Sequence, residues 1–434
     1  MSTLLKQLDP LMDARCGILN KPIPLPFPPG FEGHMFGFSS SIGQITALHP
    51  KAVSATLDMA GYGTAWDETT ARIRACCEAL ERYCSVMYPL RGVVSATTRE
   101  LGDAALDPSR LPQCSVRERL RANPEHRLRI PDPAAEERWV EGFSLTTGKP
   151  AWIPLSVAYL GLPDPLSAQL LFPESTGFAT GSTYEGAILS GLCEVIERDS
   201  LALWWLHQLP MPRIERSVWD GAPELAELLD RADRSGLETH LLDLTTDLGI
   251  PIVGLVQISN RSSPHVVAMG ACRTTTNAAA LRVVEEAGSL RVALGWSKAL
   301  PNPEGLRSGA PRSPMDFGLL YAGTGAPEKF SFATRRSPKT SKLSGNDIRS
   351  KPLETMVRGL ATKDLEVFVV DVTLPEVRAA GLVVVRVIVP ELMRISFAHS
   401  IRYLAHPRLY SAPERMGFGR RSEDMITDEP IPFA

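Results

Sequence analysis

Residues 177–200 read GFATGSTYEGAILSGLCEVIERDS, and a related stretch, GYGTAWDETTARIRACCEALERYC, occupies residues 61–84. The two segments share seven identical residues at a constant offset of 116 positions. The identical pairs are Gly61 and Gly177, Thr64 and Thr180, Ala71 and Ala187, Cys77 and Cys193, Glu78 and Glu194, Glu81 and Glu197, and Arg82 and Arg198. Each copy predicts a glycine-containing turn that leads into a helix bearing E-x-x-E-R, which implies a duplicated structural unit.

A third and weaker copy of this unit is predicted at residues 280–291, ALRVVEEAGSLR, where Glu286 takes the position of Glu78 and Glu194. Apolar periodicity predicts helices within 54–92, ending before Pro89, and at about 183–207 and 277–294. Apolar runs of strand length occur at 92–98, 151–161, 237–245, 250–259, 265–273, 365–373 and 381–390. Because strands and helices are interleaved, the predicted fold class is α/β or mixed α+β.

The chain divides by composition into two parts. Residues 1–54 are rich in proline and glycine and predict an irregular N-terminal arm, whereas 55–434 predicts one catalytic domain with a Pro-rich C-terminal tail. Within that domain, 300–352 has loop composition, and its basic stretch 335–351 is a candidate contact for an acidic peptide or simply a solvated loop.

Composition excludes several classes of protein. A 434-residue chain with 44% hydrophobic residues and a net charge of −3 is neither disordered nor polycationic, so no nucleic-acid partner is expected. Charged residues and prolines interrupt the first thirty residues, and no apolar run has membrane-spanning length, so we predict a cytoplasmic protein without membrane segments. Seven cysteines without a C-x-x-C pair predict reduced thiols and no structural zinc.

The repeated glutamates carry the candidate chemistry. Glutamates three positions apart lie on one helix face, and two neighbouring carboxylates repel unless a cation lies between them. Mg²⁺ suits such carboxylates and commonly bridges to substrate phosphates. The adjacent Arg82 and Arg198 could bind phosphate oxygens. The small residues before the second helix would let backbone N–H groups approach a phosphate; they include Ser175, Thr176, Gly177 and Ala179.

The alternative interpretation of E-x-x-E-R is a solvated helix face on which Glu and Arg pair locally. That interpretation fits a single copy well. Two copies with similar preceding segments, on helices that are apolar around much of their circumference, favour a functional role, because buried carboxylates require a partner. The chain contains no P-loop, kinase-type glycine loop or Rossmann fingerprint that would offer another nucleotide site.

Residues 175–199 and 71–83 resemble the central and N-terminal signatures of the YcaO family, with ALRVVEEAGSLR as a third block and HPRLY at 406–410 near the C-terminus. The resemblance extends over about 55–434. It implies a fold of repeated strand–helix units around a nucleotide site that binds ATP and Mg²⁺. The implied metal ligands are Glu78, Glu81, Glu194 and Glu197. The implied nucleotide contacts are Arg82, Ser175, Thr176, Gly177, Ala179, Arg198 and Glu286.

The resemblance also implies a reaction on peptides. In azoline-forming members, a Cys, Ser or Thr side chain of a ribosomally made precursor attacks the preceding carbonyl. Phosphorylation of the amide oxygen then allows elimination to thiazoline or oxazoline. Such cyclodehydratases act in the biosynthesis of thiazole/oxazole-modified microcins and other bacteriocins. Alternatives within the family are thioamide or amidine formation and a non-catalytic scaffold.

Two departures from the family pattern concern the nucleotide site. Many members carry Gly-Lys-Gly before the first glutamate helix, whereas this chain has Gly63-Thr64-Ala65 there. In addition, Arg74 replaces a small residue four positions before Glu78, and we consider it a substitute cation in the nucleotide site.

The C-terminus resembles the Pro-x-Pro-x-Pro tail that azoline-forming members extend into the active site. It ends Pro430-Ile431-Pro432-Phe433-Ala434, so Pro430, Pro432 and Ala434 are the candidate catalytic tail positions. The alternative for a Pro-rich terminus is simple disorder.

The implied partners are a precursor peptide and a separate leader-peptide-binding protein, because the arm at 1–54 is short and irregular. A flavin-dependent dehydrogenase that oxidises the azoline is a further candidate partner. The sequence leaves the oligomeric state open, a homodimer included.

Overall fold

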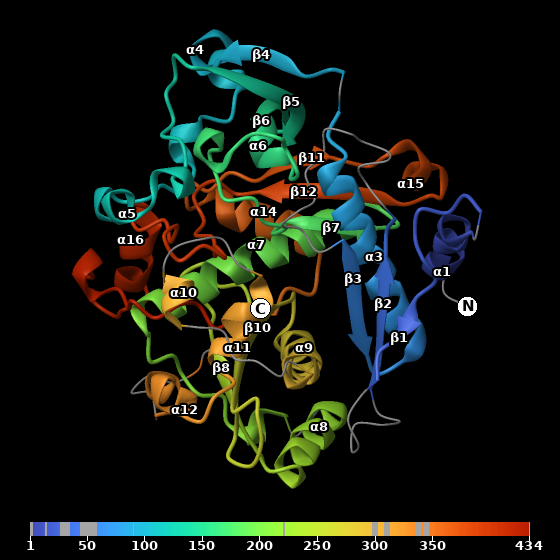
Figure 1. The fold of residues 1–434 in the computed structure, drawn as a ribbon, viewed down its shortest axis with the longest axis vertical. Coiled ribbons are helices and arrows are strands. Elements are labelled where there is room, and N and C mark those ends of the chain that lie inside the picture. Colours follow the sequence, from blue (N-terminus) through green and yellow to red (C-terminus); the bar gives the residue numbers. More distant parts are fainter. Residues whose placement is uncertain are drawn as a thin grey trace. The chain divides into compact units, whose positions relative to one another are not determined.

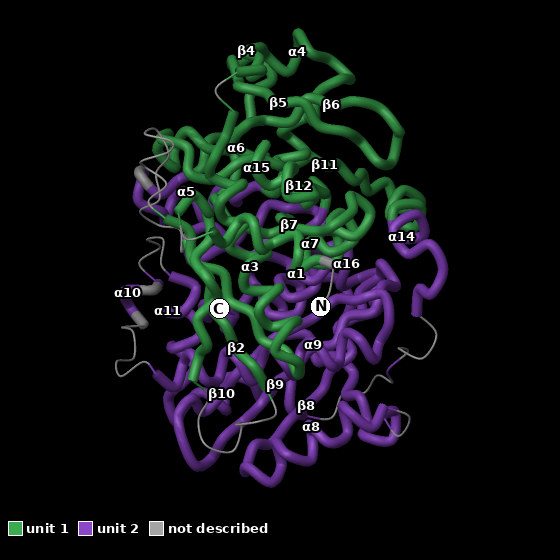
Figure 2. The backbone as a smooth tube through the Cα atoms, turned by 90° about the vertical axis from the view of Figure 1, so that its right-hand side faces the viewer, with its two compact units in different colours: residues 1–112, 128–195, 357–391 green, residues 113–127, 196–356, 392–434 purple. Residues whose placement is uncertain are grey.

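The computed structural model describes residues 3–13, 15–26, 35–43, 59–89, 91–219, 222–296, 303–307, 313–335, 341 and 347–433. These residues form two compact units, each assembled from several stretches of the chain (Figure 2). Unit 1 contains residues 1–112, 128–195 and 357–391, and unit 2 contains residues 113–127, 196–356 and 392–434. The long helix α7 (Tyr184–His207) begins in unit 1 and ends in unit 2.

Unit 1 contains two antiparallel sheets (Figure 1). The smaller sheet has the order β1-β2-β3, formed by β1 (Ile23–Pro24), β2 (Phe36–Ser41) and β3 (Ala60–Ala65). The larger sheet has the order β4-β5-β11-β12-β7, with β6 paired to β5. Its strands are β4 (Val94–Thr97), β5 (Glu136–Ser144), β6 (Lys149–Pro154), β7 (Phe178–Gly181), β11 (Phe368–Asp371) and β12 (Val383–Ile388). The helices of this unit include α1 (Thr3–Leu8), α3 (Glu68–Val86), α4 (Thr98–Leu101), α6 (Leu155–Ala158) and α15 (Pro375–Ala379).

Unit 2 has one antiparallel sheet of order β10-β9-β8, and every residue of its central strand is buried. The strands are β8 (Leu237–Asp243), β9 (Ile252–Ser259) and β10 (Val266–Cys272). α9 (Thr276–Gly295) packs on β9 and β10, and α8 (Pro223–Arg234) packs on β8. Further helices are α5 (Val116–Arg121), α10 (Pro303–Arg307), α11 (Pro314–Leu320), α12 (Ala326–Lys329), α13 (Ser331–Thr334) and α16 (Pro407–Arg415), and α14 (Pro352–Ala361) runs from unit 2 into unit 1.

The structure supports the predicted repeat, including its third copy, as three strand–helix pairs. These pairs are β3 with α3, β7 with α7, and β10 with α9. Each helix starts at a side-chain cap eleven positions before the first glutamate of its copy, since Asp67 accepts from Thr70 N–H, Thr183 from Gly186 N–H and Thr275 from Ala278 N–H. The fold class is therefore the mixed α/β arrangement that the sequence predicts.

The glycines of the first copy lie on a strand rather than in the predicted turn, whereas Gly177 of the second copy lies in a turn directly before β7. Gly61 and Gly63 belong to β3, which packs so closely on α3 that an added Cβ would lie 2.2 Å from Ala75 O and 2.1 Å from Ala71 O. In the second copy Gly177 has a φ of +89°, and an added Cβ would lie 2.2 Å from Val387 O. Close packing of β3 on α3 explains Gly61 and Gly63, and the close approach of β12 explains Gly177.

The sequence missed several short elements. The predicted N-terminal arm contains α1 and β2, and β2 pairs in register with β3. The predicted loop region 300–352 contains helices α10 to α13, whereas most of its basic stretch 335–351 lies outside the described residues. The predicted strand 151–161 divides into the end of β6 and the helix α6. Tertiary pairing decides these elements, because a short segment has little conformational preference of its own.

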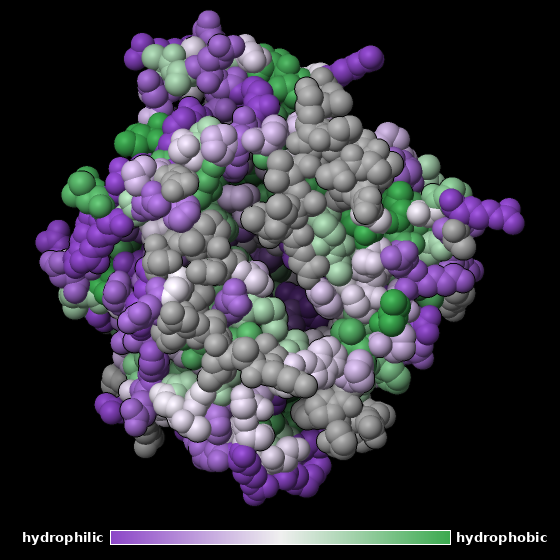
Figure 3. Space-filling view, viewed as in Figure 1, coloured by the Kyte–Doolittle hydropathy of each residue, from purple (hydrophilic) through white to green (hydrophobic). Residues whose placement is uncertain are grey.

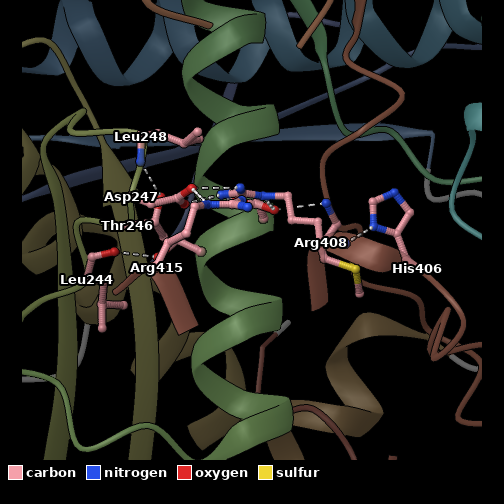
Figure 4. A network of polar contacts seen from close by, with 10 residues as sticks. Leu244, Thr246, Asp247, Leu248, His406, Arg408 and Arg415 are labelled. Carbon is pink, nitrogen blue, oxygen red and sulfur yellow. Dashed lines mark hydrogen bonds and ion pairs between the residues drawn. The ribbon is translucent and has the colours of Figure 1, made fainter. Parts of the chain in front are cut away.

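A buried ion-pair network ties α7 to α16 within unit 2 (Figure 4). Arg408, from the HPRLY block, donates to both carboxylate oxygens of Asp199 at 2.6 Å and to Asp247 at 2.9 Å. Asp199 also accepts from the backbone N–H of Met393, and the more exposed Arg415 donates to Asp247 at 2.8 Å. Asp199 is 0% exposed, so each negative charge of this "Arg408 network" is buried beside a positive one.

None of the described helices combines the length and the apolar character needed to cross a bilayer. All seven cysteines are free thiols, and five of them are buried, as the sequence predicts for reduced cysteines.

Candidate functional site

Three of the predicted metal ligands come together in unit 1. Each accepts a backbone N–H: Glu78 from Tyr62 in β3 at 2.9 Å, Glu194 from Gly177 in the turn before β7 at 2.9 Å, and Glu81 from Thr180 in β7 at 2.8 Å. The first glutamate of each helix therefore binds the segment that precedes its own helix. Glu81 instead reaches β7, in the next copy of the repeat.

In this "unit 1 carboxylate group" (Glu78, Glu81 and Glu194), Glu81 lies close to two other negative charges. Burial, followed by repulsion from Glu78 and a smaller contribution from Glu194, raises the pKa of Glu81 to about 8, although the Thr180 N–H and Arg82 work in the opposite direction. A cation close to this carboxyl group would stabilise its charged form.

Unit 2 holds the matching "unit 2 carboxylate group", made of Glu197 and Glu286. Glu197 accepts from the backbone N–H of Cys272 at 2.9 Å. Cys272 occupies the position in β10 that Thr180 occupies in β7. Burial and repulsion from Glu286 raise the pKa of Glu197 to about 7, against the attraction of Arg198 and Arg273. The repeat is thus continued, because the second glutamate of each pair binds the strand of the following copy.

The residues present fit a hard divalent cation. Their donors are carboxylate oxygens, and buried carboxylates with raised pKa values would be stabilised in the charged form by Mg²⁺. Among the residues that the structure describes, no three Asp, Glu, His or Cys side chains form a ready-made metal cage. Mg²⁺ does not require one, since it commonly binds through one or two carboxylates together with water and substrate phosphates.

Arginines accompany both carboxylate groups. Arg82 pairs with Glu78 at 3.0 Å, and its side chain is 22% exposed. A local Glu–Arg pair of this kind is what a solvated helix face would also form. In unit 2, Arg282 pairs with Glu286 at 2.6 Å and lies close to Glu285. Arg282 and Arg273 were not predicted from the sequence as site residues. The spacing of Arg282, four residues before Glu286 on one helix face, was an available signal.

The remaining predicted nucleotide contacts have structural roles of their own. Thr176 and Ala179 are buried, and Ala179 pairs with Val385 in the sheet. Ser175 O accepts from Phe178 N–H, and Gly177 N–H is bonded to Glu194. Arg74, the proposed substitute cation, donates to the carbonyl of Thr64, at the position where many family members have lysine.

The C-terminal tail is packed into unit 2. Residues 430–433 are buried, Tyr321 Oη donates to Pro430 O at 2.5 Å, and Trp205 Nε1 donates to Glu429 O at 3.1 Å. The ring of Phe433 lies 6.1 Å from that of Trp204. Residues 430–433 are therefore ordered, in contrast to the alternative of a disordered Pro-rich terminus. Ala434 lies outside the described residues.

Comparison with known families adds a match over residues 61–393 to the family model described as YcaO cyclodehydratase, ATP- and Mg²⁺-binding. That description names both predicted cofactors, so the prediction of ATP and Mg²⁺ is confirmed. An uncharacterized protein in the tfuA 3′ region of Rhizobium leguminosarum bv. trifolii is 32% identical over 169 residues, 36% of this chain and 39% of that protein. An uncharacterized protein of Methanothermobacter thermautotrophicus (strain Delta H) is 28% identical over 358 residues, 80% of this chain and 85% of that protein.

Three solved structures share the fold. A heterocyclase in complex with substrate and cofactor has a TM-score of 0.81 at 22% identity, and the match covers 100% of this chain and 57% of that chain. The heterocyclase TruD has a TM-score of 0.69 at 25% identity, with 83% and 50% covered. YcaO from Methanopyrus kandleri, bound with AMPPCP and Mg²⁺, has a TM-score of 0.60 at 19% identity, with 90% and 88% covered. This chain therefore spans about half the length of the two heterocyclases.

Proposed function

Because this chain belongs to the YcaO family, we propose that it is an ATP-dependent enzyme that phosphorylates a backbone amide oxygen of a peptide. In its azoline-forming version, a Cys, Ser or Thr side chain attacks the preceding carbonyl carbon, and the resulting oxyanion takes the γ-phosphoryl group of ATP. The attack closes the five-membered ring, and loss of that oxygen as phosphate, together with the amide N–H proton, then forms the C=N bond of the thiazoline or oxazoline. The net change is ATP to ADP and phosphate, with one water removed from the peptide.

The observation that carries this proposal is the pair of carboxylate groups, each with a glutamate whose pKa is raised first by burial and then by a neighbouring like charge. Bound Mg²⁺ would neutralise charge on the triphosphate during phosphoryl transfer. The residues that would hold it are Glu78, Glu81, Glu194 and Glu197. Positioning and charge stabilisation account for most catalysis of phosphoryl transfer, so this chain need not supply a covalent nucleophile.

The basic residues around these groups would bind the phosphates. Arg82, Arg198 and Arg282 would offset phosphate charge as the oxygen atoms of the triphosphate replace their present carboxylate partners. Arg74 would take the place of the missing lysine. Glu286 and the segment Ser175, Thr176, Gly177 and Ala179 would complete the nucleotide contacts. The tail positions Pro430, Pro432 and Ala434 would take part in the peptide reaction.

Nucleotide binding tests the site directly. Calorimetric titration with AMPPCP and Mg²⁺ should give about 100-fold weaker binding for Glu194→Gln than for wild type, because the change removes a ligand charge but keeps the hydrogen-bond acceptor. Glu185→Gln is the matched control, since Glu185 lies exposed on the first turn of the same helix. Equal affinities for wild type and both variants would rule out this site.

The product identifies the reaction type. The test mixes the protein with Mg·ATP, a precursor peptide and a leader-binding partner, and analyses the peptide by mass spectrometry. Loss of one water per modified residue supports azoline formation, whereas exchange of oxygen for sulfur indicates a thioamide and incorporation of an amine indicates an amidine. An unchanged peptide, with phosphate release no faster than in Glu194→Gln, would indicate a non-catalytic scaffold.

The proposed partners are a ribosomally made precursor peptide, a leader-peptide-binding protein and a flavin-dependent dehydrogenase. One solved structure that shares the fold is described as a heterocyclase in complex with substrate, which supports a substrate among these partners.

A further inference from the structure

α5 exposes apolar and basic side chains side by side on unit 2. Val116 and Leu120 are 75% and 76% exposed, the highest values among the large hydrophobic side chains of the described residues. Arg117 and Arg121 are also exposed and occupy the next positions in the sequence. Residues four apart share a helix face, so the two apolar and the two basic side chains form adjacent stripes. Apolar groups exposed in this way commonly mark a contact surface.

The surroundings of α5 extend this surface. A shallow open groove beside the helix is lined by Leu404, Ala405 and Tyr410, with Arg421 at its edge. Met425, 51% exposed, lies in a short turn that two contacts hold against α5: Ser115 Oγ donates to Glu423, and Arg117 pairs with Asp424. In Figure 3, strongly hydrophobic atoms protrude at the left edge, where Figure 1 places α5, among hydrophilic ones.

The exposed charge of α5 is positive because its acidic residue is turned inward. Glu118 is 4% exposed and accepts backbone N–H groups from Ser115, Arg402 and Leu404 at 2.7 to 2.8 Å. The carboxylate paired with Arg117, that of Asp424, is itself 88% exposed and can be displaced. Arg121 has no carboxylate within ion-pair distance among the described residues. A basic face on a chain of net charge −3 favours an acidic partner.

A polar pocket of about 430 Å³ adjoins the groove and shares Arg117, Arg121 and Leu404 with it. Arg307, Arg402 and His399 line its interior together with acidic residues. Its four arginines are matched by four carboxylates, Glu118, Glu423, Asp424 and Asp428, so the pocket extends the polar surface beside the groove without adding net positive charge.

We propose that α5 and the adjoining groove form a docking site for an acidic, amphipathic segment of another polypeptide. Its apolar side chains would contact Val116 and Leu120, and its carboxylates would pair with Arg117, Arg121 and Arg421. This docking site uses none of the residues assigned to nucleotide binding, so it goes beyond the proposed enzymatic function.

The test uses fluorescence anisotropy with a labelled synthetic peptide that carries leucine and glutamate stripes at helical spacing. We expect the full-length protein to bind it, and two double variants, Val116→Ser with Leu120→Ser and Arg117→Glu with Arg121→Glu, to bind about tenfold more weakly. The matched controls are Val218→Ser, which changes another half-exposed valine of unit 2, and Lys363→Glu, which reverses an exposed charge elsewhere; both should bind as wild type does.

Several outcomes would overturn the proposal. These are the absence of binding, equal binding by both double variants and wild type, equal binding of a peptide with lysine in place of glutamate, and tighter binding of a single-stranded oligonucleotide, which would indicate a general polyanion surface. Two further measurements separate this proposal from the proposed function. Glu194→Gln should bind the peptide normally, and both double variants should bind AMPPCP with Mg²⁺ normally.

Discussion

The Arg408 network and the unit 1 carboxylate group both remove carboxylates from water, but they differ in charge balance. In the network, Asp199 and Asp247 meet the guanidinium groups of Arg408 and Arg415. In the carboxylate group, glutamates lie close enough to one another for repulsion to help raise the pKa of Glu81 to about 8. A balanced buried cluster stabilises the folded chain, whereas an unbalanced one is costly until a cation binds.

The largest expected effect comes from unbalancing the network. Arg408→Met should lower the free energy of unfolding by about 3–5 kcal/mol, because two buried carboxylates would lose their shared cation. Chemical denaturation with an unchanged m-value measures this loss. The control is Arg415→Met, whose half-exposed side chain should contribute less than about 1 kcal/mol. Equal small losses in both variants would contradict the structural role of Arg408.

A double variant tests whether the contributions of Asp199 and Arg408 depend on each other. Asp199→Asn combined with Arg408→Met removes one charge of each sign, so fewer charges remain buried without a partner. We expect the double variant to be more stable than the sum of the single losses predicts, by about 1–3 kcal/mol. The four denaturation curves of this mutant cycle provide the measurement. Additive losses would mean that the two side chains do not depend on each other.

In the unit 1 carboxylate group, removing one charge should raise the free energy of unfolding and not lower it. Without Mg²⁺ and nucleotide, Glu81→Gln should raise the free energy of unfolding by about 1 kcal/mol, because the amide oxygen can still accept from Thr180 N–H while the repulsion is gone. AMPPCP with Mg²⁺ should then stabilise wild type more than the variant in thermal melts. A destabilised Glu81→Gln protein would show that this carboxylate has a structural role.

The two regions should also differ in their pH dependence. Glu81, with a pKa of about 8, and Glu197, with a pKa of about 7, stabilise the fold fully below the ordinary glutamate pKa of 4.5, and this contribution is lost as pH rises through the folded-state pKa. The pKa of Asp247 is lowered by Arg408 although burial opposes this, so its contribution is lost as pH falls below 3.8.

In metal-free buffer, wild type should therefore lose stability between about pH 5 and pH 8. The double variant Glu81→Gln with Glu197→Gln should show a flatter curve in denaturation experiments across that range. Identical curves for wild type and the variant would mean that the two glutamates titrate alike in the folded and unfolded chains.

Much of the fold and of the candidate site follows from local sequence. The helices α3, α7 and α9 appear where apolar periodicity places them, and the strands of unit 2 match the apolar runs at 237–273. The repeated E-x-x-E-R identified the glutamates that accept backbone N–H groups from the strands or from the turn before a strand. Spacing along a helix is a local property, so a sequence pattern can reveal it.

Contacts between distant segments were decided only by tertiary structure. The pairing of Glu81 with Thr180 and of Glu197 with Cys272 joins successive copies of the repeat, and Arg408 meets Asp199 across more than two hundred positions. The exposure of Val116 and Leu120 beside a buried Glu118 is equally non-local. The sequence alone determined which side chains share a helix face, whereas charge balance depends on which segments pack together, and packing is a property of the whole folded chain.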